Sequence, residues 1–393
     1  MTARIPCSAT DPLTLRRSWS LMVSVHGRPG SRVRKPQEPR YLRSSDGRRT
    51  PHRSSRRSRP ARVLTCVLVI ITVVVSACTS GPTTQPAAVS QPATADPRSA
   101  EADSTPPRIV DGGQPSFPIR AAFYYQWFPE GWRQGGVFPF TAYTPSLGLY
   151  DSGAAATIKS HIESMRFGNI AAAIVSWWGP NEKAEQSRVP ALLAGAGEAD
   201  PAFRIALYYE KEGTADPSVA ELKDDLDYIS ARYTSQENYL LVGGRPVLFV
   251  YNADDTDCTV VDRWKAADAA HHFYLDLKVF PGWSSCPAQP DGWHQYGPAE
   301  SRSEITTGSA ADGSFTISPG FSRAHNAGTT QPQLDRDPGR WSQDIRAMKA
   351  SQQNWQLITS FNEWGEGTAV ESATQWATAS GQGAYLDALH ADG

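Results

Sequence analysis

The sequence has few of the residues and patterns that bind metals or phosphate groups. Its 393 residues include five cysteines and eight histidines, but no Cys-x-x-Cys pair, no His-Glu-x-x-His motif and no histidine cluster. No glycine-rich phosphate-binding turn follows the first predicted strand, which argues against a nucleotide-binding open sheet. The sequence therefore predicts neither a metal site nor a cofactor.

Acidic residues are scarce in the first part of the chain. Residues 1–62 hold 16 Lys and Arg against three acids, whereas the remainder holds 22 against 37. A basic arm often binds nucleic acid, but this one leads directly into an apolar run, so no nucleic-acid partner is expected. Its Arg, Ser and Pro content without apolar periodicity predicts disorder. A translation start assigned too early, with Met22 as a later candidate, would explain its length.

The apolar run that follows is short for a membrane-spanning helix. The segment 63–78 follows a basic flank and consists of an apolar core that ends in small residues, a pattern typical of a secretory signal. The run ends in "VSAC", which resembles a bacterial lipobox whose cysteine, here Cys78, becomes the lipid-modified first residue. We expect an exported lipoprotein anchored to the outer face of the cytoplasmic membrane, with an uncleaved membrane anchor as the alternative. Residues 79–107, rich in Thr, Ser, Pro and Ala, are expected to be a flexible linker.

Residues 108–393 are predicted to form one folded domain, because no second low-complexity break occurs. The predicted strands are the apolar runs at 121–128, 169–179, 203–210, 245–252, 273–283, 291–297, 315–321 and 355–364. Helical spacing appears between several of them, most clearly at 217–233. About eight strands with intervening helices predict a single (β/α)₈ barrel of the TIM type, in the α/β class. An open doubly wound sheet is the alternative.

The predicted export determines which cysteines can pair in the folded domain. Only Cys258 and Cys286 lie in the predicted domain beyond Cys78. Two cysteines in an oxidising compartment are expected to form a disulfide. Two buried free thiols are the alternative.

Aromatic, amide and acidic residues gather at the C-terminal ends of the predicted strands, where a barrel carries its chemistry. Sugars stack on flat rings and hydrogen-bond to acids and amides, so this composition indicates a carbohydrate site. The residues predicted to bind substrate are Glu210, Tyr125, Trp127, Trp178, Tyr251, His294, Tyr296, Asn362 and Trp364. Core packing is the alternative for each ring. Of the adjacent Trp177 and Trp178, one is expected in the core, because neighbours on a strand face opposite ways.

The last predicted strand ends in "SFNEWGEGT", in which Glu363 and Glu366 lie three residues apart. Their side chains would diverge on an extended strand, but Gly365 and Gly367 allow a turn that directs both to one site. Paired acids suit glycosidic bond hydrolysis, in which one protonates the leaving oxygen and the other handles the developing positive centre. Glu363 and Glu366 are therefore the predicted catalytic residues, with a solvated acidic loop as the alternative.

The segment "ITSFNEWGEGTAVE" (358–371) resembles the signature of glycoside hydrolase family 99, the endo-α-mannosidases and endo-α-mannanases. The stretches "FYYQWF", "IVSWWG", "YYEKEG", "RPVLFVY", "GWHQYGP" and "ISPGF" fit the same relatives in order, so the resemblance covers nearly all of 120–372. It implies a retaining (β/α)₈ enzyme without a metal, in which the sugar's 2-hydroxyl attacks to form a 1,2-anhydro intermediate. It also implies that the partner is an α-linked oligo- or polysaccharide, with α-mannosides cut internally.

The resemblance also implies roles for individual residues. Glu363 matches the general base that assists the 2-hydroxyl, and Glu366 matches the general acid that later activates water. Glu210 matches an acid in the sugar pocket, and Tyr251 and Tyr296 match aromatic positions near it. Several family members carry histidine where this chain has Gly365, a departure that bears on substrate identity more than on reaction type.

Two other functions remain open at this point. A related family of cell-surface polysaccharide biosynthesis proteins carries a similar Asn-Glu-Trp-x-Glu-Gly segment, which makes glycosyl transfer an alternative. Transfer normally requires an activated donor, which is scarce outside the membrane. A non-catalytic glycan-binding lipoprotein is the other alternative; it would tolerate loss of either glutamate, whereas this chain keeps both.

Overall fold

The computed structural model describes residues 109–110, 113–253, 256–307, 313–322 and 331–392. The predicted basic region (1–62), the signal segment with Cys78 (63–78) and the linker (79–107) lie outside the described residues. Among the helices of the described residues, none combines the length and the apolar character that crossing a membrane requires.

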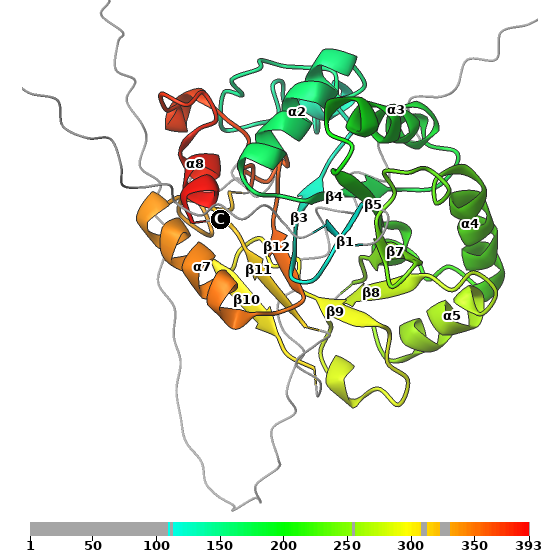
Figure 1. The fold of residues 1–393 in the computed structure, drawn as a ribbon. Helices are drawn as coiled ribbons and strands as arrows, with labels where there is room; N and C mark the ends of the chain where they lie inside the picture. Colours follow the sequence, from blue (N-terminus) through cyan, green and yellow to red (C-terminus); the bar gives the residue numbers. More distant parts are fainter. Residues whose placement is uncertain (1–108, 111–112, 254–255, 308–312, 323–330, 393) are drawn as a thin grey trace, which may run out of the picture. The chain divides into compact units, whose positions relative to one another are not determined.

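The described chain folds into the predicted barrel. Its eight strands in chain order are β3 (Ile119–Tyr124), β4 (Ala172–Trp177), β5 (Arg204–Tyr209), β7 (Arg245–Val250), β8 (Tyr274–Lys278), β9 (Gly292–His294), β11 (Ser314–Ile317) and β12 (Trp355–Ile358). Parallel pairing runs from β11 through β12 and β3 to β9 (Figure 1). Thr316 of β11 donates from Oγ1 to the carbonyl oxygen of Gln295, just after β9, at 2.6 Å. This bond joins the two ends of the sheet.

Helices cover the outside of the barrel unevenly (Figure 1). The α-helices of the described residues are α2 (Ala155–Phe167), α3 (Lys183–Ala199), α4 (Val219–Arg232), α5 (Thr259–Asp268), α7 (Pro338–Ser351) and α8 (Ala384–Ala391). Each of β3, β4, β5, β7, β11 and β12 is followed by one of them. The described residues after β8 instead form the 3₁₀ turn η3 (Trp283–Ser285), and those after β9 form β10 (Arg302–Ile305), which pairs antiparallel with β11.

Shorter elements complete the described chain. Strand β1 (Ile109–Val110) pairs with β2 (Gln114–Pro115), and β6 (Leu241–Val242) pairs with β7. Single 3₁₀ turns are η1 (Glu130–Trp132), η2 (Lys211–Gly213) and η4 (Thr374–Trp376). Two of these turns, η1 and η2, are the next elements after β3 and β5, so they lie in the connections that leave the C-terminal ends of these strands, where the predicted site lies.

Helix α4 shows how local sequence determines a helix start. The Ser218 hydroxyl accepts the N–H of Glu221 at 3.3 Å, and the Glu221 carboxylate accepts the N–H of Ser218 at 2.8 Å. This capping box satisfies two N–H groups that have no partner inside the helix. Leu222, Leu226 and Ile229 are buried on one face, which confirms the helix predicted at 217–233.

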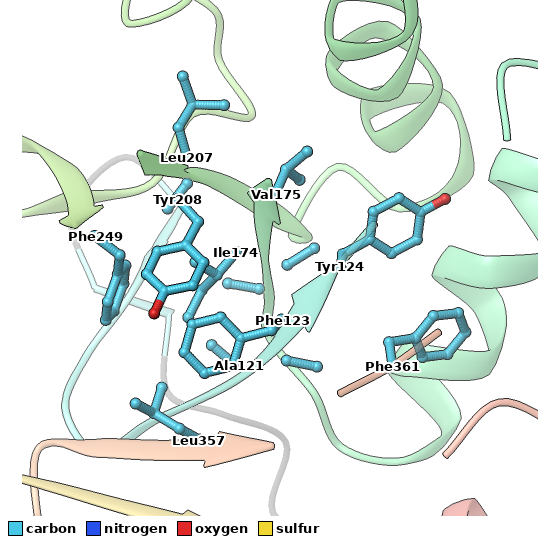
Figure 2. Close-up of a cluster of buried hydrophobic side chains, with 14 of the residues drawn as sticks. Ala121, Phe123, Tyr124, Ile174, Val175, Leu207, Tyr208, Phe249, Leu357 and Phe361 are labelled. Atoms are coloured by element: carbon cyan, nitrogen blue, oxygen red, sulfur yellow. The ribbon is translucent and has the colours of Figure 1, made fainter. Parts of the chain in front are cut away.

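Aromatic rings fill the inside of the barrel (Figure 2). The ring of Phe123 lies 4.8 Å from that of Tyr208 and 6.4 Å from that of Phe249, centroid to centroid. Tyr124, the next residue along β3, faces outward, and its ring lies 5.7 Å from that of His161 on α2. Burying one such side chain stabilises a fold by roughly 1.5–3 kcal/mol, so these layers hold the strand ends in register.

Cys258, just before α5, and Cys286, just after η3, form a disulfide. The bond joins the start of α5 to the connection between β8 and β9, where the described chain has no α-helix. The cysteines are 28 residues apart. A closed loop of that size contributes about 3.5 kcal/mol in the chain-entropy account.

Candidate active site

Predicted site residues leave the strands at one end of the barrel. Tyr125, Trp178, Glu210 and Tyr251 directly follow β3, β4, β5 and β7, and Tyr296 follows β9 by two residues. Because the strands run in parallel, these positions share the C-terminal end, where barrel enzymes carry their chemistry. The structure therefore brings together five of the predicted residues from five strands.

Residues 359–371, which follow β12 and are named here the glutamate loop, carry Glu363 and Glu366. Ser360 Oγ accepts the N–H of Glu363 at 2.8 Å and contacts Thr368 Oγ1 at 2.8 Å. These bonds tie the first half of the loop to the second. They hold the segment between the glutamates in a turn at the end of β12, as predicted.

The two glycines of the glutamate loop serve different purposes. Gly367 has a φ of +69°, in the left-handed region that favours glycine. Gly365 lies outside that region, so the prediction of an unusual backbone is right for Gly367 and wrong for Gly365. A Cβ on Gly365 would lie 2.7 Å from a ring carbon of Phe140, so space rather than backbone requires a glycine there.

A chain of hydroxyl groups reaches Glu366. Tyr125 Oη donates to Tyr296 Oη at 2.8 Å, and Tyr296 Oη donates to Glu366 Oε2 at 3.2 Å. Burial raises the pKa of both tyrosines well above the usual value, and the negative charges of Glu363 and Glu366 raise it further. Both hydroxyls therefore stay protonated and donate toward the carboxylates.

Glu363 lies in surroundings that disfavour its charge. Its side chain is 7 % exposed, and burial raises the pKa of the carboxyl well above its usual range. The negative charges of Glu366 and of Glu210 raise that pKa further, while the backbone N–H groups of Glu366 and Gly365 lower it. A carboxyl group whose pKa is raised by burial and by like charges holds its proton more tightly, a property that is typical of acid–base sites.

Aromatic rings surround these carboxyl groups. Trp127 packs its ring 4.5 Å from that of Tyr125 and is 8 % exposed. Tyr251 and Trp178 are partly exposed and so keep surface for a ligand. Trp177 is fully buried, which confirms that one of the two adjacent tryptophans belongs to the core.

Asn362 and Trp364, predicted to bind substrate, have buried side chains that serve the scaffold. Asn362 Oδ1 accepts the N–H of Tyr125 at 2.8 Å, and its Nδ2 donates to the Tyr125 carbonyl at 2.9 Å. Trp364 Nε1 lies 3.2 Å from Glu371 Oε2 and 3.1 Å from Tyr150 Oη. Both side chains are fully buried, so the prediction of substrate contact is corrected to one of positioning the glutamate loop.

His294 needs the same correction. It lies on β9, fully buried inside the barrel. Its Nδ1 lies 2.8 Å from Asp276 Oδ1, and its Nε2 lies 3.0 Å from Tyr208 Oη, so both ring nitrogens are occupied by the protein. Burial holds the pKa of His294 well below its usual range. A neutral, fully partnered imidazole in the core has no contact left for a sugar.

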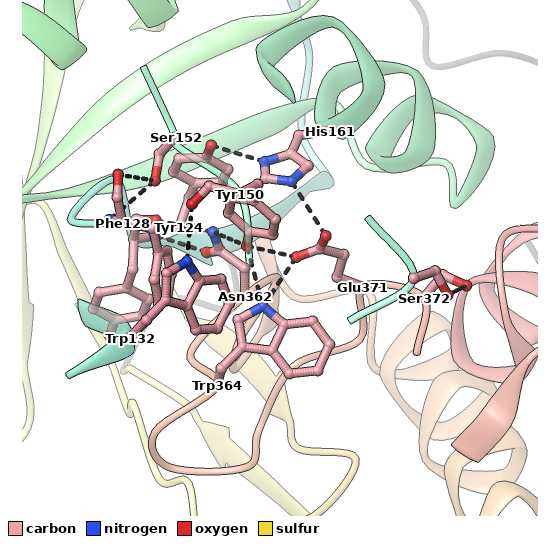
Figure 3. A network of polar contacts seen from close by, with 12 residues as sticks. Tyr124, Phe128, Trp132, Tyr150, Ser152, His161, Asn362, Trp364, Glu371 and Ser372 are labelled. Atoms are coloured by element: carbon pink, nitrogen blue, oxygen red, sulfur yellow. Dashed lines mark hydrogen bonds and ion pairs between the residues drawn. The ribbon is translucent and has the colours of Figure 1, made fainter. Parts of the chain in front are cut away.

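A residue that the sequence analysis did not identify, Glu371, lies at the end of the glutamate loop and at the centre of a buried polar network (Figure 3). Tyr150 Oη donates to Glu371 Oε2 at 2.8 Å, and His161 Nε2 lies 3.2 Å from Oε1. Tyr124 Oη contacts the other ring nitrogen of His161 at 2.9 Å. No local pattern singles out this carboxylate, because Glu221 also follows two apolar residues and is exposed.

Arg336 is a second residue that the sequence analysis missed. Its guanidinium lies 4.0 Å from the ring centroid of Trp376 and 4.8 Å from those of Tyr143 and Tyr385. Nη2 donates to the carbonyl oxygens of Gly367 at 2.8 Å and of Ala369 at 2.6 Å. The rings hold the cation in place, and the cation holds the second half of the glutamate loop.

The arrangement places proton donors and acceptors side by side. One carboxyl group has a raised pKa, a second accepts a tyrosine hydroxyl, and a third lies near the first. Within the described ranges, no three His, Cys, Asp or Glu side chains are grouped so as to hold a metal ion. The side chains at hand therefore suit proton transfer to and from a bound ligand.

Comparisons with known proteins agree with this geometry. Residues 139–270 match the model of glycosyl hydrolase family 99. Two solved structures of the family 99 endo-α-mannosidase from Bacteroides thetaiotaomicron, one in complex with bis-tris-propane, are similar to this chain. They have TM-scores of 0.56 and 0.57 at 20 % and 18 % identity, over 70 % of this chain and 96 % of theirs. No match was found among curated proteins. The structural likeness shows the barrel fold, and the match to the family model supports a glycoside hydrolase.

Proposed function

We propose that this protein is an exported retaining glycoside hydrolase that cleaves α-linked glycans, acting internally on α-mannosides. The observation that carries the proposal is the convergence of Glu363, Glu366 and Glu210 at the C-terminal end of the barrel, where their charges oppose one another. Partly exposed rings beside them provide stacking surfaces for a sugar. The match to the family 99 model and the name of the similar structures support the reaction and the substrate class.

The proposed reaction divides the work between two carboxyl groups. Glu363 takes the proton of the sugar's 2-hydroxyl while that oxygen attacks the anomeric carbon and forms a 1,2-anhydro sugar. The glycosidic bond breaks, and Glu366 gives its proton to the leaving oxygen. In the second half, water attacks the anomeric carbon, Glu366 takes a proton from the water, and Glu363 returns its proton to the sugar oxygen. Protons balance over the cycle, and both acids end in their starting states.

The protonation states of Glu363 and Glu366 in the free protein make this division of roles testable. Burial and opposing charges favour a protonated Glu363 in the free protein, whereas the Tyr296 hydroxyl donates to Glu366 and favours its ionised form. The proposed reaction needs the reverse distribution. Binding of the sugar must therefore move the proton from Glu363 to Glu366, or the two residues exchange roles.

Product analysis against a panel of α-linked glycans tests the function. Hydrolysis releases new reducing ends, and internal cleavage releases oligosaccharides rather than single sugars. A glycan-binding protein would return its ligand intact, and a transferase would form product only when an activated donor is supplied. Either of these results would overturn the proposal. A 2-deoxy substrate should resist cleavage, because it lacks the internal nucleophile.

We also propose that the mature chain begins at Cys78 and is held by lipid at the outer face of the cytoplasmic membrane. The support is the lipobox-like "VSAC" after an apolar run, followed by a polar stretch. Cys78→Ala should release the protein from the membrane or stall its processing. Unchanged membrane association together with normal cleavage would contradict the lipid anchor.

A further inference from the structure

Phe140 belongs to the connection between β3 and α2 and reaches across to the glutamate loop. Its N–H donates to the carbonyl of Trp132 at 2.8 Å, and Gln134 and Val137 pair closer to the tip, so residues 132–140 form a hairpin. Trp132 Nε1 donates to the Tyr150 carbonyl at 2.8 Å and anchors the hairpin base. Phe140 is 4 % exposed, so its ring is packed against the fold and not offered to solvent.

The ring of Phe140 occupies the space where a side chain on residue 365 would be. A Cβ on Gly365 would lie 2.7 and 2.9 Å from two ring carbons of Phe140 and 3.0 Å from Glu363 Oε1. Non-bonded atoms in a folded protein are not packed this closely, so a side chain on residue 365 would displace the ring or the loop. Because the backbone of Gly365 lies outside the left-handed region, the glycine is required only for the room it leaves.

The same space is bordered by Glu363. The ring of Phe140 lies 2.7 Å and Glu363 Oε1 lies 3.0 Å from the point at which a Cβ of Gly365 would lie, so both side chains line the space that Gly365 leaves open. An aromatic ring excludes water from the side of the carboxylate that it covers and limits the rotamers that the carboxylate can adopt. The other groups acting on Glu363 are Glu366 on the same loop and Glu210 at the end of β5.

We propose that Phe140 is a positioning residue for Glu363. Its ring holds the orientation of the carboxylate and shields one side of it from water. Gly365 leaves the space that the ring needs to reach this position. The assignment of chemistry to Glu363 rests on the proposed function. The packing of the ring and of the carboxylate oxygen around Gly365 is independent of that function.

Direct titration of Glu363 tests the proposal without an activity assay. The carboxyl resonances of the protein, labelled at glutamate side chains, are followed against pH, and the resonance of Glu363 is identified by its loss in Glu363→Gln. Phe140→Ala should lower the pKa of Glu363, because water then reaches the carboxylate. Phe140→Leu should restore most of the wild-type value, since leucine also excludes water. An unchanged pKa in Phe140→Ala would overturn the proposal.

A matched control separates this effect from general loss of packing. Phe280, which follows β8, is also 4 % exposed, and its ring packs 5.8 Å from that of Trp293. Phe280→Ala should lower the thermal stability to a degree similar to Phe140→Ala while leaving the pKa of Glu363 unchanged. An equal change in that pKa in both variants would show that Phe140 acts only as core packing.

A double substitution tests whether Phe140 and Gly365 act as a pair. Gly365→Ala alone should reduce kcat by up to about 100-fold, because the methyl group displaces the ring and the carboxylate. The same change made in Phe140→Ala should have much less effect, since the cavity left by the ring accepts the methyl group and the Glu363 oxygen can shift. Independent effects of the two changes would contradict the pairing. If the wild-type chain cleaves no glycan, the proposed function fails, while the titration still decides the role of Phe140.

Discussion

Two buried glutamates on the glutamate loop lie in opposite surroundings. Glu371, 3 % exposed, accepts the Tyr150 hydroxyl and lies within 3.2 Å of a ring nitrogen of His161. Glu363, 7 % exposed, faces the charges of two other carboxyl groups, which backbone N–H groups of its own loop partly offset. Similar burial on the same loop therefore gives one structural carboxylate and one with a strongly raised pKa.

Partners, rather than burial, thus distinguish an acid that serves the scaffold from one whose charge the fold disfavours. A carboxylate surrounded by donors stabilises the fold that orients it. A carboxyl group that the fold crowds with like charge makes the folded state less stable when it ionises, which is typical of functional sites. Arg336 and Asn362 supply the rigidity that holds Glu363 in that position.

The largest expected effect is on catalysis, and it is expected for Glu363 and not for Glu371. Glu363→Gln should lower kcat by about 10²- to 10⁴-fold, or about 3–5 kcal/mol of barrier, with good and poor leaving groups alike. Glu366→Gln should spare substrates whose leaving group needs no proton. Rates on a series of aryl glycosides measure both. The opposite pattern would exchange the roles of the two acids, and near-full activity of both variants would end the paired-acid mechanism.

Replacing the scaffold glutamate should affect stability first. Glu371→Gln should lower the free energy of unfolding by about 1–3 kcal/mol, because the amide removes the negative charge and replaces one of the two acceptor oxygens with an NH2 group. These oxygens face Tyr150 and Trp364 on one side and His161 on the other. Urea denaturation measures the loss, with Glu363→Gln as the matched variant that should lose little or none. Comparable losses in the two variants would remove the distinction between the two glutamates.

The raised pKa of Glu363 predicts a pH-dependent difference in stability. Because its pKa is higher in the folded chain than in the unfolded chain, its ionisation reduces stability as pH rises through the folded-state pKa. Glu363→Gln should therefore have a higher Tm than the wild type at alkaline pH. The gap should close below the ordinary glutamate pKa of about 4.3. Tm measured across pH tests this, and a constant gap would argue against a raised pKa.

The smallest expected effect comes from the third carboxyl group. Glu210→Gln removes one of the negative charges that raise the pKa of Glu363. If Glu363 acts as the base, the acid limb of the kcat/KM profile should move to lower pH, whatever the change in the maximum rate. An acid limb that stays in place would mean that Glu210 affects the sugar alone.

Local patterns along the chain were sufficient for the eight strands of the barrel, but not for shorter elements such as β10 or for the last helix, α8. Alternation and apolar runs gave the eight strands, and the spacing at 217–233 gave α4 with its capping box. These signals arise from hydrogen bonds and burial among residues a few positions apart, so they can be read without the rest of the structure. The two acids of "SFNEWGEGT" were visible for the same reason, because their spacing and the glycines beside them are local.

The sequence alone thus determined the order of the eight barrel strands and the acids that follow the last of them. Only the tertiary structure decided which side chains touch. Asn362 bonds to Tyr125 across 237 positions of the chain, and Tyr150 bonds to Glu371 across 221. Such pairs form because of how the barrel closes and how rings and loops pack. The local spacing of residues in the sequence does not predict them. The sequence therefore predicted that Asn362 contacts substrate. In the closed barrel its side chain instead joins the end of β3 to the glutamate loop.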